Sequence, residues 1–278
     1  MTNCRVDGQS GLAMIRLALA IVLLGAFPAY AQRAELIART ALRVCADPNN
    51  LPYSNQAEEG FENRIAAIVA ADLGLPVSYV WFPQVTGFVR NTLRAHECDL
   101  VMGTVTGDSV MDSTNPYYHT GYMIVTRTAD GLTAQRVDDP ALAGKRFGII
   151  AATPPTDLLV RHGLMDHVRP YPLRVDTRIS NPPRAMMQDL LDDVIDVALV
   201  WGPAAGYAIQ HDHLPLTARF LQSEPNAPRL DYRIAMGVRA NEPEWRRRIN
   251  QAITKNSVEI AAVLVAYGVP SLDNSAPQ

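Results

Sequence analysis

Short apolar runs alternate with amphipathic segments over the first part of the chain. The run at 42–46 (LRVCA) predicts a strand, the segment 60–74 has apolar residues at helical spacing, and 76–82 predicts a second strand. A second helical segment follows at 85–97, before a third short apolar run at 98–103. Strands and helices that alternate with short connections indicate a parallel α/β sheet with right-handed crossovers.

The same alternation restarts further along the chain. A strand is predicted at 144–150, and a helix at 153–163 begins with Thr and Pro and ends with Gly. A second helix is predicted at 182–193, a buried strand at 195–202 and a third helix at 203–211. The sequence therefore contains two α/β units.

Two longer alternating segments, 117–127 and 230–239, bracket the second unit, and helical segments follow at 242–253 and 257–268. If the bracketing segments pair as crossover strands, the second unit is inserted into the first. We therefore expect a two-lobed hinge protein. The expected boundaries are 32–124 with 232–278 for lobe 1 and 125–231 for the inserted lobe 2.

Residues 1–31 have the three parts of a secretory signal peptide. Arg5 and Arg16 precede an apolar run at 17–27, and 29–31 (AYA) offers small residues for cleavage. The run is shorter than the roughly 20 apolar residues that span a bilayer comfortably. We expect a cleaved signal, a periplasmic protein and no membrane insertion of the mature chain; an uncleaved anchor is the alternative.

Charge and cysteine content narrow the possible partners and the compartment. The formal net charge is −3 and no run of Lys or Arg stands out, which argues against nucleic acid and anionic membranes as partners. Cys4 would leave with the signal peptide. Cys45 and Cys98 would remain as an even pair in an oxidising compartment.

Three stretches carry a resemblance to a known family: CDLVMGTVTG, STNPYYHTGYMIVTR and LDYRIAMGVR. They resemble the type II periplasmic solute-binding fold, in particular the family 3 proteins that bind polar amino acids. The first two are similar to their third strand, ligand loop and first hinge strand, and the last resembles the returning hinge strand. The resemblance covers nearly the whole expected mature chain. It implies an α/β fold of two lobes, each a mixed, mostly parallel sheet flanked by helices, joined by two crossover strands.

Four blocks carry a narrower resemblance: RVCADPNNLPYSN, GFENRIAAIVA, FVRNTLRAHECDLVMG and IDVALVWGPAAGY. They look like the binding-protein homologues associated with PQQ-dependent alcohol dehydrogenases, the J component encoded in methanol-oxidation gene clusters. This resemblance implies an accessory factor whose partner is a quinoprotein alcohol dehydrogenase, its c-type cytochrome acceptor, or both. We expect a monomer without a cofactor, and a small-molecule ligand is left open as a further partner.

The resemblance also bears on the two remaining cysteines. In this fold the first and third strands are neighbours, which brings Cys45 and Cys98 into one region of the sheet. A disulfide needs Cα atoms about 4.4–6.8 Å apart, and adjacent strands are about 4.8 Å apart. We expect a disulfide; two buried free thiols are the alternative, because the strand register is not fixed by the sequence.

Ligands of open α/β sheets lie outside the carboxyl ends of the strands, which selects cleft candidates from strand ends, loops and the hinge. The candidates are Asp47, Asn49, Asn50, Tyr53, Trp81, Thr104, Thr106, Asp108, Tyr117, Thr153, Trp201 and Tyr207. Each aromatic residue could equally pack in a core. Thr153 begins a predicted helix, where it could help bind an anion or simply cap the helix.

Two departures from the family pattern disfavour an amino acid as the ligand. Family 3 amino-acid binders typically have an Arg after the third strand that pairs with the ligand carboxylate, but 106–113 contains none. They also have an Asp for the ligand ammonium where Trp201 stands here. Two charge-assisted contacts of about 1.5–3 kcal/mol each would be missing, so we expect no conventional amino-acid import.

Three function classes remain in competition. The first is the dehydrogenase accessory factor, and the second is the receptor of an ABC importer for a small polar solute other than a standard amino acid. The third is a dehydratase-like enzyme that uses Asp47 and Asp108 as acid and base. We expect no enzyme and no metal site, because the sequence HDH at 211–213 lacks i, i+4 spacing and no G-x-S-x-G elbow is present.

Overall fold

The computed structural model describes residues 1–2 and 39–273, so residues 3–31 of the predicted signal peptide lie outside the described residues. The chain divides into two units, Met1–Leu36 and Ile37–Gln278. All the helices and strands named below belong to the second unit. No helix in the described part of the chain is both long and apolar enough to cross a membrane.

The first part of the chain builds one half of a nine-stranded mixed sheet. Strand β1 (Leu42–Ala46) lies between β4 (Val77–Trp81) and β5 (Leu100–Val105) and is parallel to both. Helix α2 (Phe61–Leu73) buries Phe61, Ile65 and Val69 with this half of the sheet. These elements confirm the predicted strands and the first helix. Two short strands, β2 (Asn49–Asn50) and β3 (Ser54–Asn55), form a small hairpin after β1.

The second α/β unit is also present, with its central strands parallel to one another. Strand β7 lies between β9 and β8, and α5 and α6 pack against this part of the sheet. The elements are β7 (Phe147–Ile150), α4 (Pro154–Arg161), β8 (Val168–Tyr171), α5 (Pro182–Leu191), β9 (Val197–Trp201), α6 (Gly202–Gln210) and β10 (Leu216–Phe220). Short 3-10 helices are η1 (Thr128–Asp130), η2 (Pro140–Leu142) and η3 (Met165–His167).

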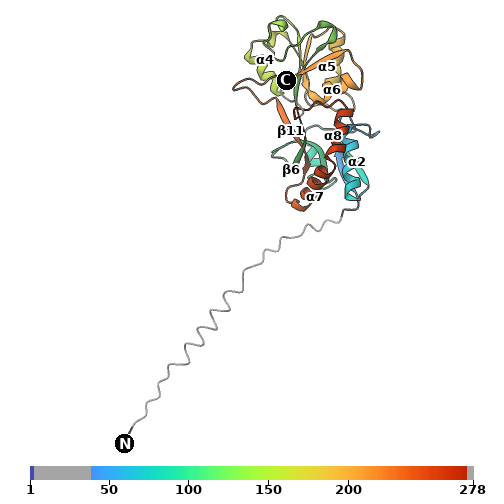
Figure 1. The fold of residues 1–278 in the computed structure, drawn as a ribbon, viewed down its shortest axis with the longest axis vertical. Helices are drawn as coiled ribbons and strands as arrows, with labels where there is room; N and C mark the ends of the chain where they lie inside the picture. Colours follow the sequence, from blue (N-terminus) through green and yellow to red (C-terminus); the bar gives the residue numbers. More distant parts are fainter. Residues whose placement is uncertain (3–38, 274–278) are drawn as a thin grey trace. The chain divides into compact units, whose positions relative to one another are not determined.

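The two bracketing segments pair with one another, as expected for crossover strands. Strand β6 (Asp112–Arg127) runs antiparallel to β11 (Asp231–Val238) and continues to pair with β9 and β10. The strand order is β4-β1-β5-β11-β6-β9-β7-β8, with β10 on β6. The last two helices are α7 (Pro243–Lys255) and α8 (Ser257–Ala266). Figure 1 shows β6 and β11 between two parts of the fold: one carries α4, α5 and α6, and the other carries α2, α7 and α8.

Buried apolar residues form separate cores on the two sides of this crossing. One core draws on β1, α2, β5, α7 and α8, and includes Trp245 and Phe61. Two others draw on β6, β7, β9 and the helices around them, with Phe147 and Met186 fully buried. This division supports the proposed lobes, in which residues 125–231 are inserted between 32–124 and 232–278; those boundaries stay a prediction.

The segment predicted as a helix at 85–97 is mostly irregular. Only α3 (Phe88–Asn91) is helical, after Gly87 with φ of +95°. The Thr92 hydroxyl donates to the Phe88 carbonyl at 2.7 Å, a local bond that competes with helix continuation. The chain then turns back towards β5, which the apolar spacing alone did not indicate.

Candidate functional site

A cavity of about 590 Å³ lies where the ends of β5 and β9 approach the segment 172–183, which we call the strap. This volume is within the usual range for small-molecule pockets. Predicted cleft residues that line the cavity are Asn50, Tyr53, Thr104, Thr153 and Trp201. Further lining residues that the sequence reading did not select include Glu62, Gln84, Gly103, Tyr118, Tyr122, Thr177 and Tyr232.

Several predicted aromatic residues lie outside this lining. Trp81 stacks on Tyr79 with ring centroids 4.6 Å apart. The Tyr117 hydroxyl donates to the backbone carbonyl of Met102 at 2.8 Å, and its partly buried side chain packs against the core that includes Phe61 and Trp245. Tyr207 lines a second cavity of about 670 Å³. Trp81 and Tyr117 therefore pack against neighbouring residues, and Tyr207 lines another cavity.

The predicted polar residues after β5 are engaged with neighbouring groups. The Thr106 hydroxyl donates to the Arg233 carbonyl at 2.7 Å. Asp108 accepts a bond from the Val110 backbone at 2.7 Å and one from the Thr104 hydroxyl at 3.3 Å. Asp108 therefore closes a local turn and does not line the cavity.

Thr153 lies at the N-cap position of α4, but its hydroxyl does not cap the helix. It donates instead to the carbonyl of Ile150 at 2.6 Å. Pro154 and Pro155, which follow it, have no N–H to offer an anion. Simple side-chain capping is thus wrong for Thr153, and the helix start has few free donors.

Asp47 is fully buried beside the cavity and is saturated with hydrogen bonds. Its carboxylate accepts from the backbone N–H of Asn49 at 2.9 Å, from that of Gln84 at 2.7 Å and from the hydroxyl of Thr177 at 2.6 Å. The Asn49 side chain also donates to the Thr177 carbonyl at 2.9 Å. Asp47 and Asn49 therefore hold the strap at the rim of the cavity and do not line it.

Glu62 is the functional candidate that the sequence reading missed. It lies in the first turn of α2, is 6% exposed and lines the cavity. Burial, and secondarily the charge of Asp47, raises its pKa from 4.5 to about 8. An acid in the first turn of a helix is common on electrostatic grounds alone, so the sequence held no signal that singled Glu62 out.

Aromatic rings form much of the remaining wall. Tyr122 and Trp201 have ring centroids 5.1 Å apart, and Trp201 and Tyr232 have centroids 5.9 Å apart, at interplanar angles of 65° and 56°. Tyr118 lies on the side of Glu62, and burial raises the pKa of its hydroxyl well above 10. The cavity lining in the described part of the chain contains no Arg, Lys or His.

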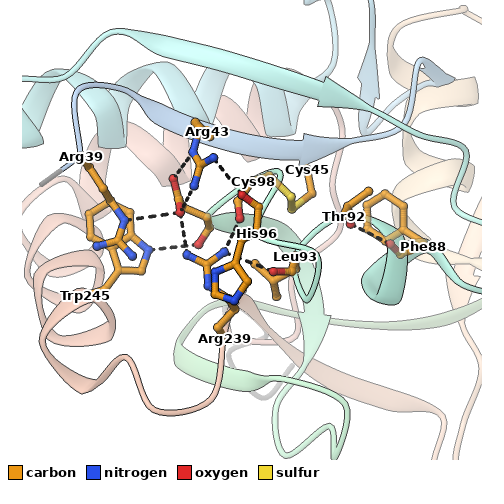
Figure 2. Close-up of a disulfide and its surroundings, with 11 residues drawn as sticks. Arg39, Arg43, Cys45, Phe88, Thr92, Leu93, His96, Cys98, Arg239 and Trp245 are labelled. Carbon is orange, nitrogen blue, oxygen red and sulfur yellow. Dashed lines mark hydrogen bonds and ion pairs between the residues drawn. A yellow bond between two sulfur atoms is a disulfide. The ribbon is translucent and has the colours of Figure 1, made fainter. Parts of the chain in front are cut away.

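A disulfide joins Cys45 on β1 to Cys98 before β5, as expected, with Cα atoms 5.4 Å apart. Cys45 lies opposite Val101 in the strand register, so Cys98 reaches it from outside the paired part of β5. Both sulfurs are buried in a small core that includes Phe88 and Leu93 (Figure 2). The bond therefore anchors the irregular segment that follows α3.

A buried ion cluster adjoins the disulfide. Asp99 is fully buried and accepts two bonds from Arg43, at 2.7 and 2.8 Å, and one from Arg239 at 2.6 Å. Burial alone would raise the pKa of Asp99, but the bonds from Arg43 and Arg239 lower it below 3.8. The Glu242 carboxylate forms ion pairs with Arg39, whose Nη2 lies 2.7 Å from Oε2, and with Arg239, whose Nε lies 2.6 Å from Oε1. These pairs fix the start of α7 against the sheet.

One group of potential metal ligands occurs away from the cavity. Ligand atoms of Asp138, His162 and Glu224 lie within 4.8 Å of one another. Arg136 donates two bonds to Asp138, at 2.9 and 2.8 Å, and lies 3.5 Å from a Glu224 oxygen. Because a guanidinium already balances these carboxylates, we assign the group a structural role.

The pocket lies at the carboxyl ends of parallel strands from both α/β units, and the family to which the sequence is similar agrees with this geometry. The sequence model described as bacterial extracellular solute-binding proteins, family 3, matches residues 42–261. The chain belongs to this family.

Three relatives of this solute-binding protein match nearly all of their own length. The structure of the periplasmic binding protein XoxJ from Methylobacterium extorquens AM1 is 39% identical, with a TM-score of 0.71, over 84% of this chain and 99% of XoxJ. The structure of MxaJ from Methlophaga aminisulfidivorans MPT is 26% identical, with a TM-score of 0.72, over 84% of this chain and 100% of MxaJ. Protein MoxJ from Paracoccus denitrificans is 26% identical over 254 residues, which cover 85% of this chain and 91% of MoxJ.

These similarities confirm the predicted family, the two-lobed type II periplasmic-binding fold class and the resemblance to the J component. The family description and the periplasmic relative also support a periplasmic location. Signal cleavage and the ligand-binding roles of individual residues stay predictions.

Replacing Thr177 with valine is expected to loosen the strap of this solute-binding protein. The change keeps the shape of the side chain but removes the donor to the Asp47 carboxylate, a bond of about 1.5–3 kcal/mol. The free energy of unfolding should fall by about 2 kcal/mol, and amide hydrogen exchange should rise within 172–183. Thr177→Ser keeps the hydroxyl and serves as the control. Unchanged exchange in the valine variant would show that other contacts hold the strap.

Proposed function

We propose that the protein is a periplasmic binding-protein-like accessory factor of a PQQ-dependent methanol or alcohol dehydrogenase system, with an interaction or activation role. The observation that carries this proposal is the 39% identity to XoxJ over 99% of that chain. The similarity to MxaJ and MoxJ supports it over a comparable length. The mature protein would begin near Gln32 after signal cleavage.

The proposed partner is the quinoprotein dehydrogenase, its c-type cytochrome acceptor, or both. A binding role is favoured over catalysis, because the Asp47 carboxylate already accepts bonds from two backbone N–H groups and the Thr177 hydroxyl. Asp108, its proposed acid-base partner, closes a turn outside the lining. Asp47 and Asp108 therefore do not face a common cavity that a substrate could enter, as the dehydratase-like alternative would require.

Association with the dehydrogenase can be tested by crosslinking and copurification. A tagged copy is expressed at its native level in a strain that makes a PQQ-dependent alcohol dehydrogenase, and captured proteins are identified by mass spectrometry. We expect the dehydrogenase or its cytochrome in the tagged sample and its absence from a sample of an unrelated tagged periplasmic protein. Unimpaired dehydrogenase activity after gene deletion, together with no captured partner, would reject the proposal.

The second candidate is the receptor of an ABC importer for a small polar solute. It is favoured by the cavity of about 590 Å³ and by the strap bonds from Thr177 to Asp47 and from Arg174 to Thr86, which close over it. A ligand that binds only the folded protein stabilises it by RT ln(1 + [L]/Kd). One strongly stabilising solute, and loss of its uptake on gene deletion with dehydrogenase activity intact, would favour import.

A further inference from the structure

Glu62 is 6% exposed and lines the cavity, and no hydrogen bond or ion pair of its carboxyl group occurs among the described residues. Its oxygens are not fully enclosed by the protein, so they open on the cavity. An added Cβ at Gly103 would lie 2.6 Å from a Glu62 oxygen, so glycine at that position leaves the space that the carboxyl occupies. A charge in so buried a place is costly without a partner, so an ionised Glu62 would be stabilised by a group that brings the opposite charge.

The described residues supply no counter-charge to Glu62. The described lining of the cavity contains no cationic side chain, and Glu62 is the sole Asp or Glu in it. A carboxyl group that faces an apolar, aromatic space can be satisfied by a cation that enters with a ligand. The attraction between the two charges would then offset the cost of removing both of them from water.

Aromatic rings line the same cavity as Glu62. The ring quadrupole attracts a cation that lies within about 6 Å of the ring centroid, most strongly for Trp. The ring planes of Tyr122 and Trp201 are inclined at 65° to one another. No Arg or Lys of the described residues lies over either ring. Tyr232 extends the wall, with Arg229 at 5.3 Å from its ring centroid.

We propose that the cleft binds a small organic cation, an alkylated ammonium with a short apolar body. Its positive charge is balanced by Glu62, and its alkyl groups lie against Tyr122 and Trp201. The inference rests on the proposed function only in taking the cleft as the ligand site, and it names the class of ligand. The absence of an Arg from the lining fits a ligand that carries no carboxylate.

Binding of such a cation is expected to release a proton from Glu62. The titratable groups that interact with it are Asp47, Tyr53, Tyr79, Tyr117 and Tyr118. Burial raises the pKa of all four tyrosines, so their hydroxyls stay neutral, while the Asp47 carboxylate accepts its own hydrogen bonds. Affinity for the cation should therefore increase from about pH 6 to about pH 8 as the carboxyl loses its proton more easily.

Choline and its neutral isostere 3,3-dimethylbutan-1-ol separate charge from shape. Isothermal titration of the purified protein is expected to show choline binding at least about tenfold more tightly than the neutral isostere. Glu62→Gln should weaken choline binding at least about tenfold and remove its pH dependence, while binding of the isostere changes less than about twofold. Tyr122→Leu should weaken choline binding with Glu62 intact, which keeps the test valid if the Gln variant folds poorly.

Two results would overturn the inference. Equal affinity of the wild-type protein for choline and the neutral isostere would show that the cavity selects its ligand by shape and not by charge. No heat with choline up to about 10 mM would show that the cavity does not accept a quaternary ammonium. Either failure leaves the dehydrogenase association intact if copurification succeeds, and a failed copurification leaves cation binding intact, so the two proposals fail separately.

Discussion

Replacing Cys45 and Cys98 with alanine is expected to lower the free energy of unfolding by about 4 kcal/mol. The bond joins residues separated by 53 positions, and the loop-entropy relation gives about 4 kcal/mol for a loop of that length. Alanine is the suitable replacement because both cysteines are buried, at 2% and 0% exposure, and a serine hydroxyl would need a partner there. The loss should concentrate in the segment 85–97, which is otherwise irregular.

Urea unfolding of the double variant and of the oxidised wild-type protein measures this difference. Wild-type protein unfolded with a reductant is the matched control, because it loses the bond without a change in sequence. A thiol assay on denatured, unreduced protein without the signal peptide should find no reactive thiol. Two reactive thiols, or a difference below about 1 kcal/mol, would mean that the bond does not constrain the unfolded chain as expected.

The sequence predicted those elements whose pattern is set by burial on a regular period. Strands β1, β5 and β9 are mostly apolar because both faces of a parallel sheet are covered, and α2 and α7 bury one apolar stripe. The edge strands β8 and β10 were not predicted. Their side chains are largely half-exposed or exposed, and β8 contains Pro170, so neither has a strong strand pattern.

The candidate site was only partly predictable, because strand ends give a location but not the direction of each side chain. Trp201 and Tyr53 reach the cavity, whereas Tyr117 at a comparable position uses its hydroxyl on the Met102 carbonyl. Glu62 was missed since an acid in the first turn of a helix is common on electrostatic grounds alone. Its burial depends on Gly103, which the fold brings next to it from strand β5.

The strap could not be predicted from a pattern, since residues 172–183 have no regular period of apolar positions. Its place is set by individual bonds, such as that from Thr177 to Asp47 at 2.6 Å. Asp47 looked like a free polar group at the end of a strand. In the structure, the same carboxylate organises the hairpin, the β4 loop and the strap together.

Glu62 is expected to make the free energy of unfolding fall as the pH rises, and Glu62→Gln is expected to remove that fall. Burial, with the charge of Asp47, raises the pKa of Glu62 from 4.5 to about 8 in the folded protein. The folded state therefore keeps a proton that the unfolded chain releases. The stability from the neutral carboxyl is fully present below pH 4.5 and is lost as the pH rises through about 8. At about 1.4 kcal/mol per pKa unit, the total loss is at most about 5 kcal/mol.

Urea unfolding of the ligand-free wild-type and variant proteins between about pH 5 and pH 9 tests this expectation. The two should be similar near the acid end, and the variant should be the more stable at the alkaline end. Glu259→Gln, which neutralises an exposed carboxylate on α8, controls for the change in net charge. The ionised Asp99 and Asp196 do not interfere, since their pKa values are lowered below 3.8 and they titrate outside this window. Parallel curves for wild type and Glu62→Gln would show that the carboxyl ionises without penalty, and the cavity would then need no cation to satisfy it.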